Sequence, residues 1–161
     1  MATTDFFMKI DGVKGESTDD KHKEEIDLLS FSWGETQQGS HAAGGGGGVG
    51  KVSMQDLHFT KRVDKASPKL MLACADGTHF KTVEIACRRA GKEQQEYLKY
   101  KLSDVLVSSY QIGGSQGEVV PMEQLSLNFA KIEVEYKPQK ADGTLDASAK
   151  AGWDLKANKA A

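Results

Sequence analysis

The chain has few cysteines and no long apolar run. Only Cys74 and Cys87 occur among its 161 residues, and both lie in apolar segments. Such placement predicts two buried thiols rather than a disulfide framework, which is typical of folding in a reducing cytosol. Every apolar stretch is well short of the ~20 residues that a membrane-spanning helix needs. We therefore expect a globular protein that does not insert into a membrane.

An excess of charge of either sign is also absent. The chain has 21 Lys and Arg against 23 Asp and Glu, and its formal net charge is -2. Nucleic-acid-binding proteins usually carry a basic face, so this balance argues against such a partner. The first residues, MATTD, show no basic segment followed by an apolar one, which predicts no Sec-type signal peptide. With 39% hydrophobic and 27% charged residues, we expect one folded domain over residues 1–161.

Motifs for catalysis or cofactor binding are missing or incomplete. No serine lies in a Gly-x-Ser-x-Gly elbow. Residues 45–51 have the glycine and lysine spacing of a phosphate-binding loop, but Val52 stands where Ser or Thr would hold magnesium. A strand pattern, not a helix, then follows, so no helix N-terminus would face a phosphate. We predict no nucleotide and no other cofactor.

The titratable residues do not form a recognisable site either. His22, His41, His58 and His79 lack metal-ligand spacing to each other or to a cysteine, so we expect surface or strand-edge histidines and no metal site. Glu133 and Glu135 would share one strand face, where solvated carboxylates are the simpler interpretation than an acid–base pair. The sequence therefore predicts no catalytic residues and a protein that is not an enzyme.

Residues 125–136 give the clearest strand pattern. Leu125, Leu127 and Phe129 alternate with polar residues, and after Ala130 the apolar positions shift by one. Alternation predicts a strand with one buried face. A β-bulge near residues 130–131, with one extra residue and a bend, would keep both apolar sets on that face.

Similar patterns occur along the rest of the chain. We expect strands at residues 6–10, 26–33, 52–63, 80–88, 97–112 and around 152–155. Residues 67–77 read as a short helix with Ser67 as N-cap, Pro68 at its first position and Gly77 at its end. Inward positions are expected at Val83, Ile85 and Cys87, with Tyr100, Leu102, Leu106 and Tyr110 together on one face of their strand.

These elements predict a mainly β fold. The repeated phase shifts favour a small antiparallel β-barrel of two curved sheets with one short flanking α-helix, and a flatter β-sandwich is the alternative. Residues 16–25 are expected to form a solvated loop. Residues 39–50, with five consecutive glycines, are expected to form a flexible loop, because glycine loses the most conformational entropy on ordering. Residues 144–161 form a C-terminal tail.

Several segments together resemble a known family. They are FMKIDGVKGES at 7–17, HKEEID at 22–27 with SWG at 32–34, QDLHFTK at 55–61, LNFAK at 127–131 and YKPQKADG at 136–143. In this order they resemble the hemolysin-coregulated protein (Hcp) family of the bacterial type VI secretion system. The resemblance extends over nearly the whole chain, from about residue 6 to residue 153.

The resemblance implies a barrel subunit that assembles into hexameric rings. It implies that rings stack into a secreted tube, with sheath and spike proteins as partners and small effector proteins carried in the lumen. It also implies synthesis in the bacterial cytoplasm and secretion through the type VI apparatus without a signal peptide. Closed rings need one patch to meet a different patch on the next copy, and edge strands can supply such patches.

The resemblance and the strand pattern together suggest residue roles. Candidates that face the lumen and its cargo are the small polar residues Ser30, Ser32, Ser126 and Asn128, although an ordinary solvated outer face explains them equally well. Candidates for ring stacking are Gln38, Gly39, Ser40, His41, Gly44, Gly46, Gly48, Val49 and Gly50. Core anchors are expected at Phe31, Trp33, Leu57, Phe59, Leu70, Leu127 and Phe129.

Two other function classes stay open at this point. A monomeric ligand-binding β-barrel would need an apolar mouth and would exist as a single copy in solution. A hydrolase would require the extra C-terminal domain of the family's fused-effector variants. Only about twenty-five residues follow Tyr136, which is too few for such a domain.

Overall fold

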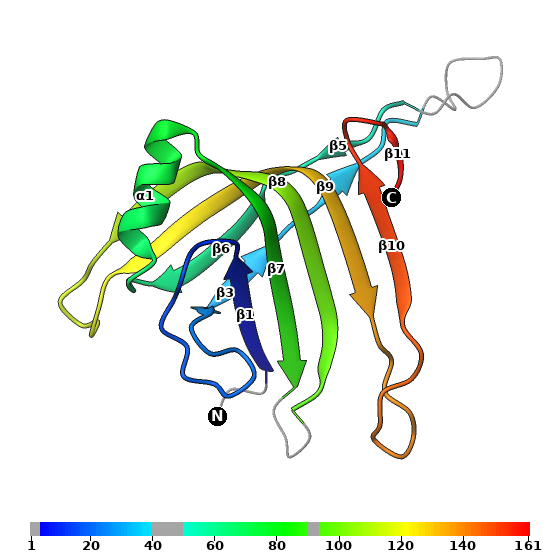
Figure 1. The fold of residues 1–161 in the computed structure, drawn as a ribbon, viewed down its shortest axis with the longest axis horizontal. Helices are drawn as coiled ribbons and strands as arrows, with labels where there is room; N and C mark the ends of the chain where they lie inside the picture. Colours follow the sequence, from blue (N-terminus) through cyan, green and yellow to red (C-terminus); the bar gives the residue numbers. More distant parts are fainter. Residues whose placement is uncertain (1–3, 40–49, 90–93) are drawn as a thin grey trace.

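The structure is a computed structural model that describes residues 4–39, 50–89 and 94–161. Figure 1 shows a curved β-structure with one helix beside it. Its elements are β1 (Thr4–Ile10), β2 (Ile26–Leu28), β3 (Ser30–Ser32), β4 (Glu35–Thr36), β5 (Ser53–Met54), β6 (Leu57–Arg62), α1 (Ser67–Asp76), β7 (His79–Arg89), β8 (Glu96–Gly113), β9 (Met122–Tyr136), β10 (Ala149–Asp154) and β11 (Lys159–Ala160). The predicted β fold with one short helix is confirmed.

Strand pairing closes the sheet into a barrel. The antiparallel ladder runs from β1 through β7, β8 and β9 to β6 and β3. Strands β2 and β3 are consecutive, and β2 pairs back with β1. The amide of Leu29, between them, donates to the Thr60 carbonyl at 2.9 Å. The predicted single strand at 26–33 is therefore one bent strand that serves two neighbours, which leaves no open edge at this seam.

The interior of the barrel is filled by apolar side chains. The fully buried members with less than 2% exposure include Met8, Ile26, Leu57, Phe59, Leu70, Val83, Ile85, Leu102, Leu125 and Leu127. Val83, Ile85 and Cys87 point inward as predicted. In β8, however, the inward residues are Leu102, Val105 and Val107, and Leu106 is only half-buried. The expectation that Leu106 shares the inward face is wrong because the phase of β8 changes after Leu102.

That phase change is shared by three neighbouring strands. Each has two buried residues three positions apart, and these form two rows across the sheet: Phe80, Val105 and Phe129, then Val83, Leu102 and Ile132. The register of β8 with β9 is the same on both sides of the change. The predicted bulge at residues 130–131 is therefore wrong, because neither β8 nor β9 inserts a residue against the other at this position. The backbone of Asp104 is distorted at this point and has a positive φ of 52°.

Two register shifts do occur elsewhere in the sheet. One lies between Val107 and Ser109 in β8 against β9, and the other lies between Cys87 and Arg88 in β7 against β8. Such shifts bend a strand and increase its twist. They therefore help the long strands β7, β8 and β9 to curve around the core (Figure 1).

The helix α1 covers one end of the barrel. Leu70 and Ala73 are buried against the core, and Gly77 ends the helix in the left-handed region at φ 71, where glycine carries no Cβ penalty. The N-cap is Ala66, so the prediction of Ser67 as N-cap is wrong. Ser67 is instead inside the helix, and its hydroxyl contacts buried charged groups below.

Those groups form a buried ion pair between β6 and β9. The Lys61 ammonium lies 2.6 Å from the Glu123 carboxylate, and both side chains have no exposed surface. Lys61 also donates to Asp64 at 2.8 Å, while Ser67 and Tyr110 donate to Glu123. Burial and the contact with Glu123 raise the pKa of Tyr110 to about 12. The network satisfies two buried charges and fastens the start of α1 to the sheet.

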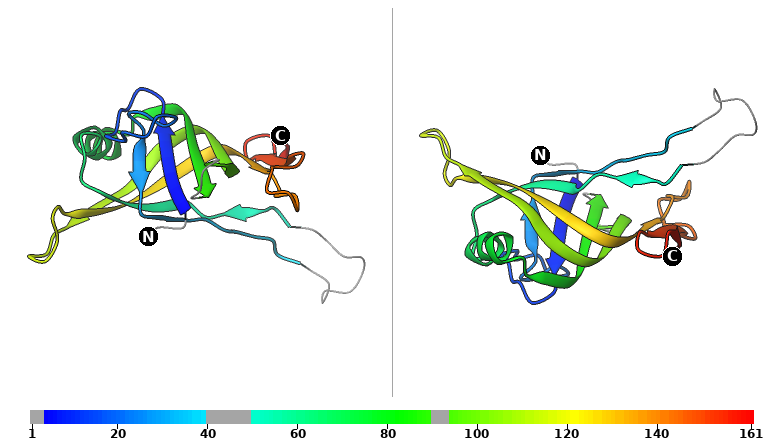
Figure 2. Two further views of the ribbon diagram at one scale, coloured as in Figure 1. Left: turned by 90° about the horizontal axis from the view of Figure 1, so that it is seen from below. Right: turned by 90° about the horizontal axis from the view of Figure 1, so that it is seen from above.

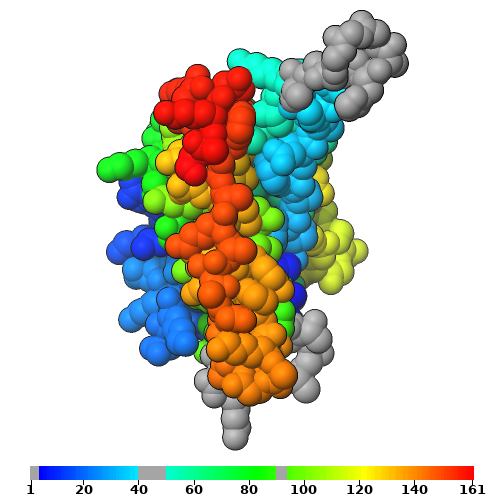
Figure 3. Space-filling model, turned by 90° about the vertical axis from the view of Figure 1, so that its right-hand side faces the viewer, coloured from blue at the N-terminus to red at the C-terminus, as the bar shows by residue number. Residues whose placement is uncertain are grey.

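The C-terminal segment docks as the sequence predicts. Strand β10 pairs with the second half of β9, and the Leu155 amide donates to the Ala130 carbonyl at 2.8 Å. Figure 3 views the molecule from this side, where β10 and its connection to β9 form a continuous strip. Trp153 packs half-buried against the core. Thus β9 pairs with β6 in its first half and with β10 in its second.

The strands β4 and β5 pair as a short two-stranded arm. Figure 2 shows this arm projecting from the barrel in both views. Beyond the paired residues, farther from the barrel, the Gly50 amide donates to the Gln38 carbonyl at 3.3 Å. A strand, β5, follows the glycine stretch where a phosphate-binding loop would need a helix.

Most predicted core anchors lie in the interior. Leu57, Phe59, Leu70, Leu127 and Phe129 are buried. Phe31 and Trp33 are half-buried at the rim of the core, where Phe31 meets Tyr100 and Trp33 meets Phe129 through aromatic contacts. Both pack against the core without being fully buried, and Trp33 follows the end of β3 at Ser32, where the chain leaves the barrel. None of the described helices is long and apolar enough to span a membrane.

Removing only one partner of the buried Lys61–Glu123 ion pair should lower the free energy of unfolding strongly. Replacing Lys61 by Met leaves the Glu123 charge buried without its cation, which typically costs about 3–5 kcal/mol. We expect the Lys61→Met/Glu123→Leu double variant to recover much of that loss, because no unpaired charge remains. Urea unfolding of the single and double variants measures both. Equal destabilisation of the two would contradict this assignment.

Candidate functional site

The outside of the barrel carries two polar faces of different chemistry. The first, here called the neutral face, is built by β3, β6, the first half of β9 and the end of β8. Paired residues form two rows: Ser30, Thr60, Gln124 and Gln111, then Ser32, His58, Ser126 and Ser109. Neither row contains Asp, Glu, Lys or Arg. The face borders a hollow of ≈ 630 Å³.

Hydroxyl groups on the neutral face bond to one another. Ser30 and Thr60 lie 2.6 Å apart, and both are at least partly open to solvent. Ser126 is bonded to Ser108 at 2.7 Å and to Ser109 at 2.5 Å, and only 3% of it is exposed. The register shift at Ser108 places two hydroxyls beside Ser126 and covers it.

The four predicted lumen-facing residues therefore divide into groups. Ser30 and Ser32 are exposed and adjacent on the neutral face. Asn128 is exposed at its border and donates to Asp56 at 2.9 Å. Ser126 is on the same face, but its burial means that it cannot itself touch a macromolecule there. Among the ring-stacking candidates, Gln38, Gly39 and Gly50 are exposed near the arm, and Ser40, His41, Gly44, Gly46, Gly48 and Val49 lie outside the described residues.

The second face, here called the charged face, continues over β1, β7, β8, the second half of β9 and β10. Opposite charges alternate across the strands in two rows: Lys9, Glu84, Lys101 and Glu133, then Lys99, Glu135 and Lys150. Lys150 contacts Glu135 at 3.1 Å, and this contact lowers the pKa of Glu135. Charges of alternating sign stabilise adjacent strands and leave little net field.

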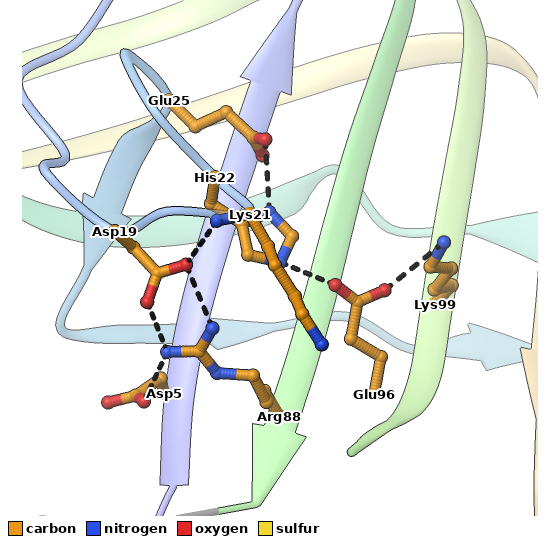
Figure 4. Close-up of polar contacts among 8 residues, drawn as sticks. All are labelled: Asp5, Asp19, Lys21, His22, Glu25, Arg88, Glu96 and Lys99. Carbon is orange, nitrogen blue, oxygen red and sulfur yellow. Dashed lines mark hydrogen bonds and ion pairs between the residues drawn. The ribbon is translucent and has the colours of Figure 1, made fainter. Parts of the chain in front are cut away.

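A folded loop covers one end of the charged face (Figure 4). Phe7 points outward from β1 but is 4% exposed, because His22 stacks on its ring at 4.2 Å and the Arg88 guanidinium lies over it at 4.8 Å. The backbone within residues 15–25 is also bonded internally, with the Gly15 amide donating to the Glu24 carbonyl at 2.8 Å. The predicted loop at 16–25 is present and most of its residues are exposed, but Ser17 and His22 are buried. An apolar side chain outside the barrel requires a cover.

His22 is the centre of this cover. It is 6% exposed, and its two ring nitrogens contact Glu25 at 3.0 Å and Glu96 at 2.5 Å. An ionised carboxylate can only accept hydrogen bonds, so this geometry suits an imidazolium that donates from both nitrogens. Burial raises the pKa of Glu96, but Lys99 and His22 outweigh it and the net shift is downward. The prediction of a surface role for His22 is therefore wrong. The contact with Glu96 could not be predicted from the sequence, because the two residues are 74 positions apart.

Arg88 provides the second anchor of the loop. Its guanidinium makes a two-pronged contact with Asp19 at 2.9 and 2.6 Å and reaches Asp5 at 3.1 Å. These contacts lower the pKa of Asp19 to about 2. The loop is thus held to β7 and β8 by charge-assisted hydrogen bonds, which are stronger than neutral ones.

A third feature is an apolar cleft at the end of the barrel next to the arm. It measures ≈ 480 Å³, and its walls include Trp33, Val52, Met54, Val134 and Trp153. The walls come from the arm on one side and from β9 and β10 on the other. This cleft is lined largely by apolar side chains and carries Glu35 at its rim.

None of these features assembles a reacting group. Within the described parts of the chain, no three His, Cys, Asp or Glu side chains come together as metal ligands. His22 is saturated by two carboxylates, and burial raises the pKa of the Cys87 thiol to about 11, which disfavours a reactive thiolate.

Comparison with known proteins identifies the family. Residues 7–136 match the family described as "Type VI secretion system effector, Hcp". Protein hcp1 of Pseudomonas aeruginosa is 52% identical over 156 residues, which is 96% of each chain. The solved structure of Hcp1 from Salmonella typhimurium is 39% identical, with a TM-score of 0.83 over 99% of this chain and all of that one.

A further solved structure, described as a type six secretion system protein, is 36% identical with a TM-score of 0.92 and covers 98% of this chain and 99% of its own. The chain therefore belongs to the Hcp family of type VI secretion tube and effector proteins. The resemblance seen in the sequence is confirmed.

The contact between Asp19 and Arg88 should make the melting temperature of the protein depend on pH. The pKa of Asp19 is about 2 in the folded protein and about 3.8 ordinarily, so its stabilising contribution is complete above the higher value and is lost as pH falls towards the lower. We expect Asp19→Asn to lower the melting temperature at pH 6 and to have little effect at pH 2. Melting curves across this range, with the exposed Asp20→Asn as control, measure it. A melting difference that does not change with pH would contradict the assignment.

Proposed function

We propose that this protein is a structural subunit of the type VI secretion tube. It assembles into hexameric rings, the rings stack, and the lumen carries small effector proteins. The neutral face is the lumen surface, and the protein acts as carrier and tube without catalysing a reaction. The family supplies the class of protein, and the observation that carries the lumen assignment is the contrast between the two outer faces.

The chemistry of the neutral face suits varied cargo. Hydroxyl and amide groups can donate and accept, so they form weak hydrogen bonds with many protein surfaces. The two rows carry no fixed charge, so this part of the lumen neither attracts nor repels cargo by its charge, although exposed Arg62 follows on the same side of β6. Exposed Ser30 and Ser32 are short, so they also leave room in the channel.

The partners follow from this role. Other copies of the same chain form the ring, and sheath and spike proteins act on the stacked tube. The arm carries the stacking contact, with Gln38, Gly39 and Gly50 beyond its paired strands. The protein is made in the bacterial cytoplasm and leaves through the type VI apparatus without a signal peptide.

A monomeric ligand-binding barrel is the competing function. The interior is occupied by the buried side chains of the core, so a ligand would have to use the cleft beside Trp33 and Trp153. Size-exclusion chromatography with light scattering separates the two functions. We expect the mass of six copies at micromolar concentration. A single copy at every concentration would contradict the ring.

A charged residue on the neutral face should affect cargo and not assembly. In Ser32→Arg, a long cation replaces an exposed hydroxyl, so we expect rings of unchanged mass that recover severalfold less effector on co-purification. The control is Thr18→Arg, which replaces another exposed hydroxyl by the same cation, on the loop that covers the charged face. If Ser32→Arg recovers as much cargo as Thr18→Arg, the neutral face does not line the lumen.

A further inference from the structure

The apolar cleft beside the arm contains both tryptophans of the chain. The sequence has two, Trp33 and Trp153, and they line the cleft together with Tyr100 as a third aromatic side chain. All three residues are only half-buried. The volume of the cleft, ≈ 480 Å³, is within the range of roughly 300–1,000 Å³ that is typical of binding pockets. The cleft is therefore an aromatic recess that can receive a ligand or a side chain of another molecule.

The walls of the cleft are fixed by backbone pairing. On the arm, Glu35 pairs with Met54, and the Gln55 amide donates to the Gly34 carbonyl at 2.9 Å. Directly paired residues of two strands share one face, so Glu35 and Met54 are neighbours in the same wall. On the opposite side, β10 pairs with β9, and β9 pairs with β8. The carboxylate of Glu35 is thus carried by a paired strand beside the aromatic side chains.

Glu35 supplies the charge of the cleft. Among the described residues that line the cleft, it is the only charged one, and none of them is Lys, Arg or His. Glu35 is exposed and makes no ion pair with any residue that the structure describes. The faces of aromatic rings also attract positive charge, and tryptophan does so most strongly. The cleft is therefore complementary to a cation.

The polar atoms of the two tryptophans are not available to an occupant. The Nε1 atoms of Trp33 and Trp153 are both buried and have no hydrogen-bond partner among the residues that the structure describes. An occupant that meets these side chains therefore contacts the carbon surface of the rings and no N–H donor. An anion needs donors, so this arrangement disfavours an anionic occupant and leaves an apolar or a cationic one.

We propose that the cleft binds an arginine side chain of a partner protein, which pairs with the Glu35 carboxylate and packs against the aromatic walls. Arginine suits the cleft better than lysine, because its planar guanidinium stacks on aromatic rings and can form two parallel hydrogen bonds with a carboxylate. Its methylene stem covers apolar wall residues such as Val52 and Met54. The cleft shares no residue with the two rows of the neutral face, so this site is separate from the proposed lumen surface.

Tryptophan emission tests the site directly, because both tryptophans of the chain line the cleft. The protein is titrated with an acetylated and amidated Gly-Arg-Gly peptide, and with the same peptide carrying leucine or citrulline, the neutral isostere of arginine. We expect a saturable change in emission with the arginine peptide and roughly threefold or more weaker binding of the other two. Equal binding of the citrulline or leucine peptide, or no saturable change with any of the three, would overturn the proposal.

Variants then locate the charged contact. Glu35→Gln removes the carboxylate of an exposed residue, so the variant should fold, which melting curves check. We expect it to weaken binding of the arginine peptide roughly threefold and to leave binding of the leucine peptide unchanged. The control is Glu118→Gln, which neutralises another exposed carboxylate on the connection between β8 and β9. If both variants bind the arginine peptide equally well, Glu35 does not hold the guanidinium and the proposal fails.

Dilution tests a second copy of this chain as the competing occupant. Tryptophan emission of the protein alone is recorded over the concentrations at which light scattering shows assemblies forming and dissociating. We expect an unchanged emission spectrum, because the cleft is then open in every state. A spectral shift that follows the loss of mass would place another copy in the cleft and would contradict an arginine of a different protein as its occupant.

Discussion

The shared phase change in β7, β8 and β9 is the constraint on which the rest of the structure depends. Two rows of buried residues, one led by Phe80 and one by Val83, lie three positions apart on all three strands. Since the strands change phase together, the hydrogen-bonded ladder continues without an inserted residue. The sheet can then curl around the core with its register unchanged, and the strand pairing is interrupted at Asp104.

The same change separates the two outer faces. Before it, β9 pairs with β6, and after it, β9 pairs with β10. The outward residues of the first half are Gln124, Ser126 and Asn128, and those of the second half include Glu133 and Glu135. One strand thus contributes to a neutral face and to a charged face. One outer surface therefore carries two rows of uncharged polar residues, while alternating charges stabilise the other.

Buried polar contacts position the parts that surround the barrel. The Lys61–Glu123 pair holds α1, and His22 and Arg88 hold the loop that covers Phe7. In each case the charges are paired and hydrogen-bonded, because an unpaired buried charge would cost far more than the contact contributes.

The sequence alone predicted the family, the order of the strands, the short helix and most of the core, because alternation and glycine or proline positions act over neighbouring residues. Local pattern could not reveal that Lys61 and Glu123 are paired, that His22 is buried against Glu96, or that Ser126 is covered by Ser108. Those outcomes depend on which strands become neighbours. The predicted bulge failed for the same reason: a phase change in one strand looks like an inserted residue until the adjacent strands are seen to change with it.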